Sequence, residues 1–219
     1  MGKQLLRLLP ILCFLALPAA AADWSIGVSS GPFVFGDFVE RHLRIGIPPT
    51  GVIVTSTLSA KTRAGLSVDL QRRLSNRWSV RAEGTFTRAP LTTGSESVTL
   101  DSGQIEVATL ALPVIFNINR GGSFRFYLYG GPAYGAYRIE RQTNATGSIG
   151  TFAGTRAEWG GEAGGGVAWM WSDRFSVEGE IADIVTGSPF REEDLSSARG
   201  TNVLTPHNVH TKLGIRYRF

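Results

Sequence analysis

Alternation of apolar and polar residues with a period of two runs through most of the chain after residue 23. The last residues show it most clearly: Leu213, Ile215, Tyr217 and Phe219 alternate with Lys212, Gly214, Arg216 and Arg218. Successive side chains of a β-strand point to opposite faces, so this period is typical of a strand with different surroundings on its two sides. No run shows a sustained helical period of 3.6. The pattern predicts an all-β protein.

Eight segments carry the alternation and predict eight strands. They lie at about residues 24–29, 64–71, 78–87, 109–117, 124–137, 159–171, 175–181 and 211–219. Short connections at 75–77, 119–123 and 172–174 alternate with long polar segments at about 37–61, 88–103, 139–157 and 186–206. An up-and-down barrel with one trimmed end has this pattern, and closure leaves no unpaired edge. We therefore predict an eight-stranded antiparallel up-and-down β-barrel with both termini at the trimmed end.

The N-terminal residues predict export from the cytoplasm. Lys3 and Arg7 precede an apolar run from residue 8 to residue 17, which is followed by Pro18 and a run of alanines. An apolar core of this length is too short to span a bilayer and is typical of a secretory signal peptide. We expect residues 1–22 to be the signal peptide and residues 23–219 to be the barrel domain. A retained membrane anchor is the alternative.

Composition excludes several other classes of protein. Cys13 lies within the predicted signal peptide, so the mature chain has no cysteine and no disulfide. Without Lys3 and Arg7, 20 basic residues stand against 18 acidic ones, a balance that does not favour nucleic acid as a partner. After the signal peptide, no run of 18 apolar residues is present. If the chain crosses a membrane, it does so with strands.

Alternation alone does not distinguish a membrane barrel from a soluble, lipocalin-like barrel. A terminal aromatic residue, the lack of a helix after the last strand and the lack of a glycine-x-tryptophan entry favour the transmembrane β-barrel. Aromatic side chains near the short turns and termini are expected to mark one membrane interface. They are Trp24, Trp78, Phe124, Trp169, Trp171, Phe175 and Tyr217, together with Phe219. A looser second set at the other strand ends is Phe33, Phe35, Phe86, Tyr134, Tyr137 and Trp159.

Charged residues occupy the face opposite the apolar one and are expected to point into the lumen. They are Asp69, Arg81, Glu83, Arg125, Glu162, Glu178, Glu180, Lys212, Arg216 and Arg218. The interior of an eight-stranded barrel is narrow enough for side chains to fill. An unpaired charge there has a desolvation cost of several kcal/mol, so we expect a connected network of ion pairs that plugs the barrel. A narrow, gated polar path is the alternative.

Three stretches resemble the small bacterial outer-membrane β-barrel family, which includes the membrane domain of outer-membrane protein A and the opacity-type proteins. They are the C-terminal stretch 209–219, the proline-containing stretch 110–115 and the glycine-rich stretch 127–135. The resemblance implies a location in the bacterial outer membrane and contact with its lipid and lipopolysaccharide. It also implies that Leu213, Ile215, Tyr217 and Phe219 form the signal read by the barrel-assembly machinery.

Catalytic and cofactor motifs are weak. Some relatives modify lipid A, but the nearest stretch to a His-x-Ser-Asn pattern is His207–His210, which lacks the serine. His207 and His210 are two ligands without a third, which defines no metal site, and we expect no cofactor. The glycine-rich stretch 161–166 interrupts an alternating strand and is followed by no helix, so we do not expect a phosphate-binding loop. We expect it to allow close approach of strands or to leave room for bulky lumenal side chains from neighbouring strands.

We therefore expect a monomeric, non-enzymatic outer-membrane barrel with a structural or surface-interaction role and long external loops. A narrow channel for small solutes is the second hypothesis, and a lipid A-modifying enzyme is the third. The apolar run 45–54, interrupted by Pro48 and Pro49, is either an extension of a hairpin above the membrane or a contact surface. Any ligand-binding function is expected to lie in the external loops. The loop sequences contain no recognisable binding motif, so the sequence does not identify the ligand.

Overall fold

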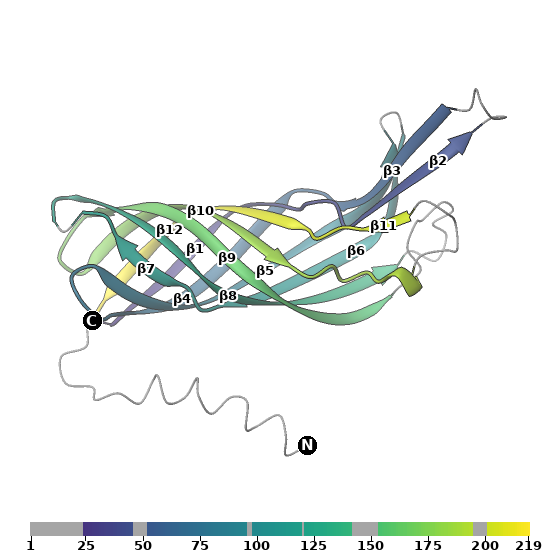
Figure 1. Cartoon of the computed structure of the whole chain (residues 1–219). Helices are drawn as coiled ribbons and strands as arrows, with labels where there is room; N and C mark the ends of the chain where they lie inside the picture. Colours follow the sequence, from purple (N-terminus) through teal and green to yellow (C-terminus); the bar gives the residue numbers. More distant parts are fainter. Residues whose placement is uncertain (1–23, 46–51, 96–97, 120, 142–152, 195–200) are drawn as a thin grey trace, which may run out of the picture.

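The computed structural model describes residues 24–45, 52–95, 98–119, 121–141, 153–194 and 201–219. Its strands form a closed antiparallel β-barrel, elongated along its axis (Figure 1). The predicted signal peptide, residues 1–22, lies outside the described residues.

Eight strand positions make up the barrel wall. They are β1 (Trp24–Val34), β4 (Arg63–Arg73), β5 (Trp78–Ser95), β6 (Val98–Ala111) continued by β7 (Val114–Asn117), β8 (Phe124–Arg141), β9 (Gly154–Met170), β10 (Phe175–Thr186) and β12 (His207–Arg218). Each wall strand pairs with its neighbours, and β1 pairs with β12 to close the barrel. The three short turns lie at the same end as Trp24 and Phe219, here called the turn end, and the opposite end is called the loop end (Figure 1). The predicted eight-stranded up-and-down barrel is confirmed.

One wall position is interrupted between β6 and β7 at Leu112 and Pro113. Proline has no N–H to donate, but the interrupted backbone is still paired: Arg81 N donates to Pro113 O, and Leu112 N donates to Pro132 O, both at 3.0 Å. A Cβ atom on Gly131 would lie 2.4 Å from Leu112 O. The two motifs at 110–115 and 127–135 therefore meet at this interruption, where only glycine permits the close approach.

The loop end carries more strand structure than the sequence predicts. Within the predicted long segments lie β2 (Val39–Ile45), β3 (Val52–Ala60), β11 (Thr201–Val203), the distal parts of β5 and β6, and the short 3₁₀ turn η1 (Glu192–Asp194). Sheet order at this end is β11–β2–β3–β5, and the β2–β3 hairpin extends beyond the barrel (Figure 1). The prediction that 37–61 and 88–103 are mainly loops was wrong. These segments are rich in threonine and valine, which favour strands once a partner strand is present.

Outward-facing positions of the wall carry exposed aliphatic and aromatic side chains. Among them, Leu66, Leu128, Leu213 and Ile215 have exposed fractions of 53, 56, 68 and 63%. A continuous apolar belt of this kind is unfavourable in water and favourable against lipid. No helix in the described part of the chain is long and apolar enough to cross a bilayer.

Aromatic side chains of the turn end lie around its outer surface. Trp78, Phe124, Trp169, Trp171 and Phe175 are exposed there, and Trp24 and Tyr217 are half-buried. The predicted second set is only partly correct: Phe86 and Trp159 are exposed, and Tyr134 packs against Trp159 with ring centroids 4.9 Å apart. Phe33, Phe35 and Tyr137 are instead buried in the lumen. Their place near strand ends suggested an interface, but their register puts them on the inner face.

Candidate functional site: the filled lumen

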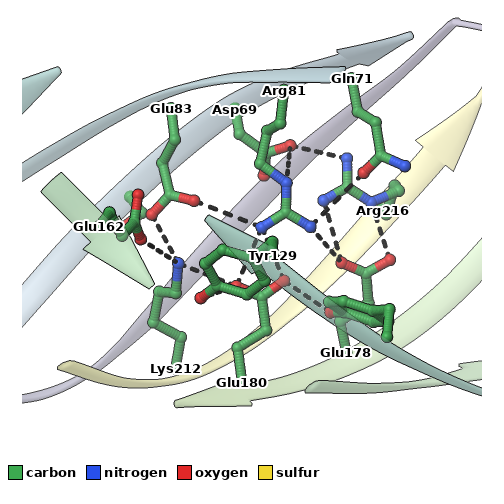
Figure 2. Close-up of polar contacts among 12 residues, drawn as sticks. Asp69, Gln71, Arg81, Glu83, Tyr129, Glu162, Glu178, Glu180, Lys212 and Arg216 are labelled. Atoms are coloured by element: carbon green, nitrogen blue, oxygen red, sulfur yellow. Dashed lines mark hydrogen bonds and ion pairs between the residues drawn. The ribbon is translucent and has the colours of Figure 1, made fainter. Parts of the chain in front are cut away.

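Eight of the ten predicted lumenal charges meet in one buried network inside the barrel (Figure 2). They are Asp69, Arg81, Glu83, Glu162, Glu178, Glu180, Lys212 and Arg216. These residues come from β4, β5, β9, β10 and β12, whose antiparallel registers bring their inner faces to the same level. The alternation predicted which face each residue occupies, and the register determines which of them meet.

Arg81 and Glu180 form the centre of the network. Arg81 Nη1 lies 2.7 Å from Glu180 Oε1 and 3.4 Å from Glu83 Oε2. Its Nε and Nη2 atoms lie 3.7 Å from Asp69 Oδ1 and 4.0 Å from Glu178 Oε2, respectively. One guanidinium thus contacts four carboxylates, which is possible because its donors radiate in a planar fork.

Lys212 connects this centre to β5 and β9. Its Nζ lies 2.6 Å from Glu83 Oε1, 2.8 Å from Glu180 Oε2 and 3.9 Å from Glu162 Oε1. Neither carboxylate oxygen of Glu162 has a hydrogen-bond partner, although the side chain is buried. Glu162 is therefore held in the network by charge alone.

Arg216 forms the part of the network nearest the turn end. Its Nε and Nη2 donate to the two carboxylate oxygens of Glu178 at 2.8 and 3.0 Å, and its Nη1 donates to Asp69 at 2.7 Å. Asp69 and Arg216 lie on strands that flank β1, and the residue between them is Gly27. A Cβ atom on Gly27 would lie 2.3 Å from Asp69 Oδ2, so this glycine leaves the space in which the pair meets.

Two tyrosines complete the network and were not singled out by the sequence. Tyr127 and Tyr129 donate to the two oxygens of Glu180 at 2.6 and 3.2 Å. Their rings lie against Gly166 and Gly164, where a Cβ atom would approach a tyrosine OH to within 2.7 Å. The predicted role of the stretch 161–166, to accommodate bulky lumenal side chains from a neighbouring strand, is confirmed. Large residues opposite inward-facing glycines are the signal that would have located the tyrosines.

Arg125 and Arg218, the other two predicted lumenal charges, do not join the network. Both line a cavity at the turn end of the lumen. Within the part of the chain that the structure describes, neither side chain makes a hydrogen bond or an ion pair, and Arg125 Nε is buried without an acceptor. Both side chains lie on the lumenal face of their strands, as expected. They lie too near the strand ends to reach the carboxylates of the network.

A second layer, made of apolar side chains, fills the lumen on the loop side of the network. This apolar layer consists of Phe33, Phe35, Phe38, Val39, Leu58, Ala60, Ala89, Leu91, Ile105, Val107, Ala111, Ala133, Tyr137, Ile139, Ile184 and Phe190. Phe38 is fully buried, and its ring centroid lies 6.3, 6.5 and 5.9 Å from those of Phe35, Tyr137 and Phe190. The sequence did not predict this layer because most of its members lie beyond the predicted strand ends.

The segment after β10 closes the apolar layer at the loop end. Phe190 belongs to this segment, and Ser188 Oγ donates to Phe38 O at 3.5 Å. Arg156 holds the segment from β9 through Pro189 O, at 3.0 Å, and through an ion pair with Asp194. The segment after β10 is therefore held against the barrel wall by a bidentate arginine–carboxylate pair, and hydrogen bonds of this geometry are strong.

The three histidines lie on different surfaces. His210 is fully buried between the two layers against Phe33, with neither ring nitrogen hydrogen-bonded. His207 lies on the outer face beside Asp183, at 2.8 Å, and His42 lies on β2 beside Thr55. Among the described residues, no group of three or more histidine, cysteine or acidic side chains has the placement to hold a metal ion.

Charge compensation in the network is incomplete but close-packed. Five carboxylates face three basic side chains, and two tyrosine hydroxyls add donors at Glu180. A void of about 10 Å³ lies beside Asp69, Glu180 and Lys212. One water needs about 10–15 Å³, so this space holds a single water at most. Within the described residues, the network is therefore closely packed around this void.

An apolar outer belt, an aromatic rim and a charged interior together define a transmembrane β-barrel of the outer-membrane type. Sequence comparison gives the same class, since the model of the "Outer membrane protein beta-barrel domain" family matches residues 8–219. The chain belongs to this family. A search of curated proteins found no match.

Solved structures of small outer-membrane barrels share the fold. OprG from Pseudomonas aeruginosa aligns with a TM-score of 0.62 at 13% identity, over 91% of this chain and 96% of OprG. Neisserial surface protein A aligns with a TM-score of 0.54 at 9% identity, over 91% of this chain and 99% of that one. AlkL, solved in lipid bilayers, aligns with a TM-score of 0.54 at 12% identity, over 93 and 95% of the two chains. The predicted resemblance and the bacterial outer-membrane location are confirmed.

Proposed function

We propose that the protein is a non-conducting, non-enzymatic outer-membrane barrel that presents strand-rich surface structure outside the cell. The single observation that carries this proposal is the filling of the lumen at two successive levels. The charged network fills one level of the lumen, and the apolar layer fills the level on its loop side, with Phe33, Phe38 and Tyr137 fully buried. A solute crossing the barrel would have to displace both layers.

Displacing the charged network is energetically costly, which favours a permanent seal. Arg81, Lys212 and Glu180 each contact several oppositely charged groups, so moving any one of them leaves other charges buried and unpaired. Breaking a buried pair on one side costs about 3–5 kcal/mol. The apolar layer offers no hydrogen bonds to a hydrated ion. Both layers therefore oppose conduction by different physical means.

The proposal that the barrel presents structure outside the cell rests on the strands that extend beyond its loop end. The β2–β3 hairpin continues past the barrel and pairs with β11 on one side and with β5 on the other, through Thr57–Ala60 and Leu91–Gly94. Paired backbone makes this a structured platform. In barrels of this family, the long loops lie on the extracellular side of the membrane. Contact with lipopolysaccharide, assembly by the barrel-assembly machinery and a monomeric state belong to the same proposal.

Single-channel recording in a planar lipid bilayer tests the seal. The refolded chain 23–219, with folding checked by the mobility difference between unheated and boiled samples, is expected to give no discrete openings. The matched pair of variants is Arg81→Gln in the network and Arg138→Gln on the outer surface, where Arg138 pairs with Glu140 at 2.9 Å. Reproducible openings in the unmodified chain whose size changes with Arg81→Gln, but not with Arg138→Gln, would replace this proposal with the narrow-channel hypothesis.

The non-enzymatic part of the proposal is tested in cells. The buried His210 and the surface His207 face opposite sides of β12, so the two do not form one catalytic centre. Lipid A from cells that produce the protein is expected to match lipid A from cells that do not, by mass spectrometry. A change in acylation would support the lipid-modifying hypothesis instead.

A further inference from the structure

The turn end of the lumen contains a cavity that the charged network leaves open. Its volume is about 90 Å³, several times the ~10–15 Å³ that one water needs. Arg81, Arg216 and Glu178 form part of its lining on the network side, and Asn76 and Asn119, in the short turns, form part of its lining at the turn end. The cavity is thus a dead-end vestibule, closed toward the loop end. In a barrel of this type the short turns face the periplasm.

Arginines from three different strands converge on this vestibule. Arg73 ends β4, Arg125 lies at the start of β8, and Arg218 ends β12. Arg73 and Arg218 are close enough for their charges to act on the Arg125 guanidinium. The barrel closure brings these strand ends together, although they are far apart in sequence.

The vestibule lining provides little negative charge for Arg125 and Arg218. In the described part of the chain, its one carboxylate is Glu178, which already accepts hydrogen bonds from Arg216 on both oxygens, at 2.8 and 3.0 Å. Ser176 Oγ also donates to Glu178, at 3.2 Å. The buried Nε of Arg125 therefore remains a donor without an acceptor. Like charges gathered in this way are unfavourable unless an anion joins them.

We propose that the vestibule is a binding site for a phosphate group presented from the periplasmic side, held by Arg125 and Arg218. The planar fork of a guanidinium matches the oxygens of a phosphate and forms short, charge-assisted hydrogen bonds with them. The cavity has room for one group of this size together with water. This site is independent of the seal described above, which lies deeper in the barrel.

A neighbouring cavity indicates how the phosphate group could arrive. Its volume is about 610 Å³, and its lining contains Arg125 and Arg218, which it shares with the vestibule, and one carboxylate, Asp173. Trp171, with 74% of its surface exposed on the aromatic rim, also lines it. The same arginines are thus accessible to a free phosphate from the periplasm and to a lipid headgroup from the inner leaflet of the outer membrane. The chemistry of binding is the same for both sources.

The first arm of the test uses inorganic phosphate. The refolded chain in a zwitterionic detergent is titrated with phosphate at constant ionic strength, with chloride as the reference anion, by isothermal calorimetry. Saturable binding of one phosphate is expected. Arg125→Gln and Arg218→Gln are each expected to weaken it by about tenfold or more, because each removes a charge-assisted donor. Arg174→Gln is the matched control, since Arg174 lies in the adjacent turn and lines neither cavity.

The second arm uses nanodiscs with and without phosphatidylglycerol. If the lipid is the source, the thermal unfolding midpoint rises with phosphatidylglycerol, and this rise is lost in Arg125→Gln and Arg218→Gln but kept in Arg174→Gln. Either arm with this pattern of variants supports the site and identifies the source. No saturable effect in either arm, or an equal loss in Arg174→Gln, would overturn the proposal. All variants are first checked for folding by heat-dependent mobility.

Discussion

Replacing Arg81 with methionine lowers the free energy of unfolding of the barrel by about 3–5 kcal/mol. Methionine keeps most of the side-chain length and removes the charge. Four carboxylates then lose their shared partner: Asp69, Glu83, Glu178 and Glu180. Lys212 and Arg216 remain, but Glu180 keeps only one of its two cationic partners. The measurement is equilibrium urea unfolding of the protein refolded into lipid vesicles, followed by tryptophan fluorescence.

Arg88→Met is the matched control for this prediction. Arg88 also contacts two carboxylates, Glu106 at 3.4 Å and Glu140 at 3.6 Å, but half of its side chain is exposed on the outer surface. Exposed pairs contribute about 0–1 kcal/mol, so this variant should unfold almost as the unmodified chain does. Equal losses in the two variants would show that burial of the network has no special energetic role.

Phe38→Ala is expected to cost about 3–5 kcal/mol of unfolding free energy through the apolar layer. The ring is fully buried and packs against Phe35, Tyr137 and Phe190, which lie on three separate segments that cannot all collapse into the space it leaves. The loss of unfolding free energy therefore includes the cost of the cavity in addition to that of the lost apolar burial. The same urea titration measures it.

Leu100→Ala provides the comparison for the apolar layer. Leu100 lies on β6 at the loop end with 49% of its surface exposed, so its truncation should change the unfolding free energy by about 0.5 kcal/mol or less. A small effect for Phe38→Ala, similar to that of Leu100→Ala, would mean that the loop side of the lumen is loosely packed. In that case only the charged network would close the barrel.

Alternation was sufficient to predict the barrel and the inner face of its strands. Asp69, Arg81 and Glu178 could be assigned to the lumen because a strand has only two faces. The glycines at 164 and 166 could be understood as space for large neighbours because an inward glycine leaves a gap in a narrow barrel. These inferences need only local sequence.

Height along the barrel axis could not be predicted in the same way. Arg125 and Arg81 both point into the lumen, yet only Arg81 reaches the carboxylates. The stagger between neighbouring strands determines how high along the barrel axis each residue lies. The apolar layer could not be predicted for the same reason: Phe33 and Tyr137 lie inside the lumen and not at the membrane interface. The loop-end strands were missed because their threonine-rich and serine-rich segments become strands only by pairing with distant partners, as Leu58 does with Thr93.

Thiol accessibility at Ser67 tests the filled lumen most directly. Ser67 lies on the inner face of β4, is 1% exposed and is hydrogen-bonded to Thr85 at 2.7 Å. Ser67→Cys is nearly isosteric, and the predicted mature chain contains no other cysteine. The refolded variant is expected to resist a small, charged methanethiosulfonate reagent, whereas Asn76→Cys, at the exposed turn end, reacts rapidly. Modification of Ser67→Cys at a rate close to that of Asn76→Cys would contradict a filled lumen.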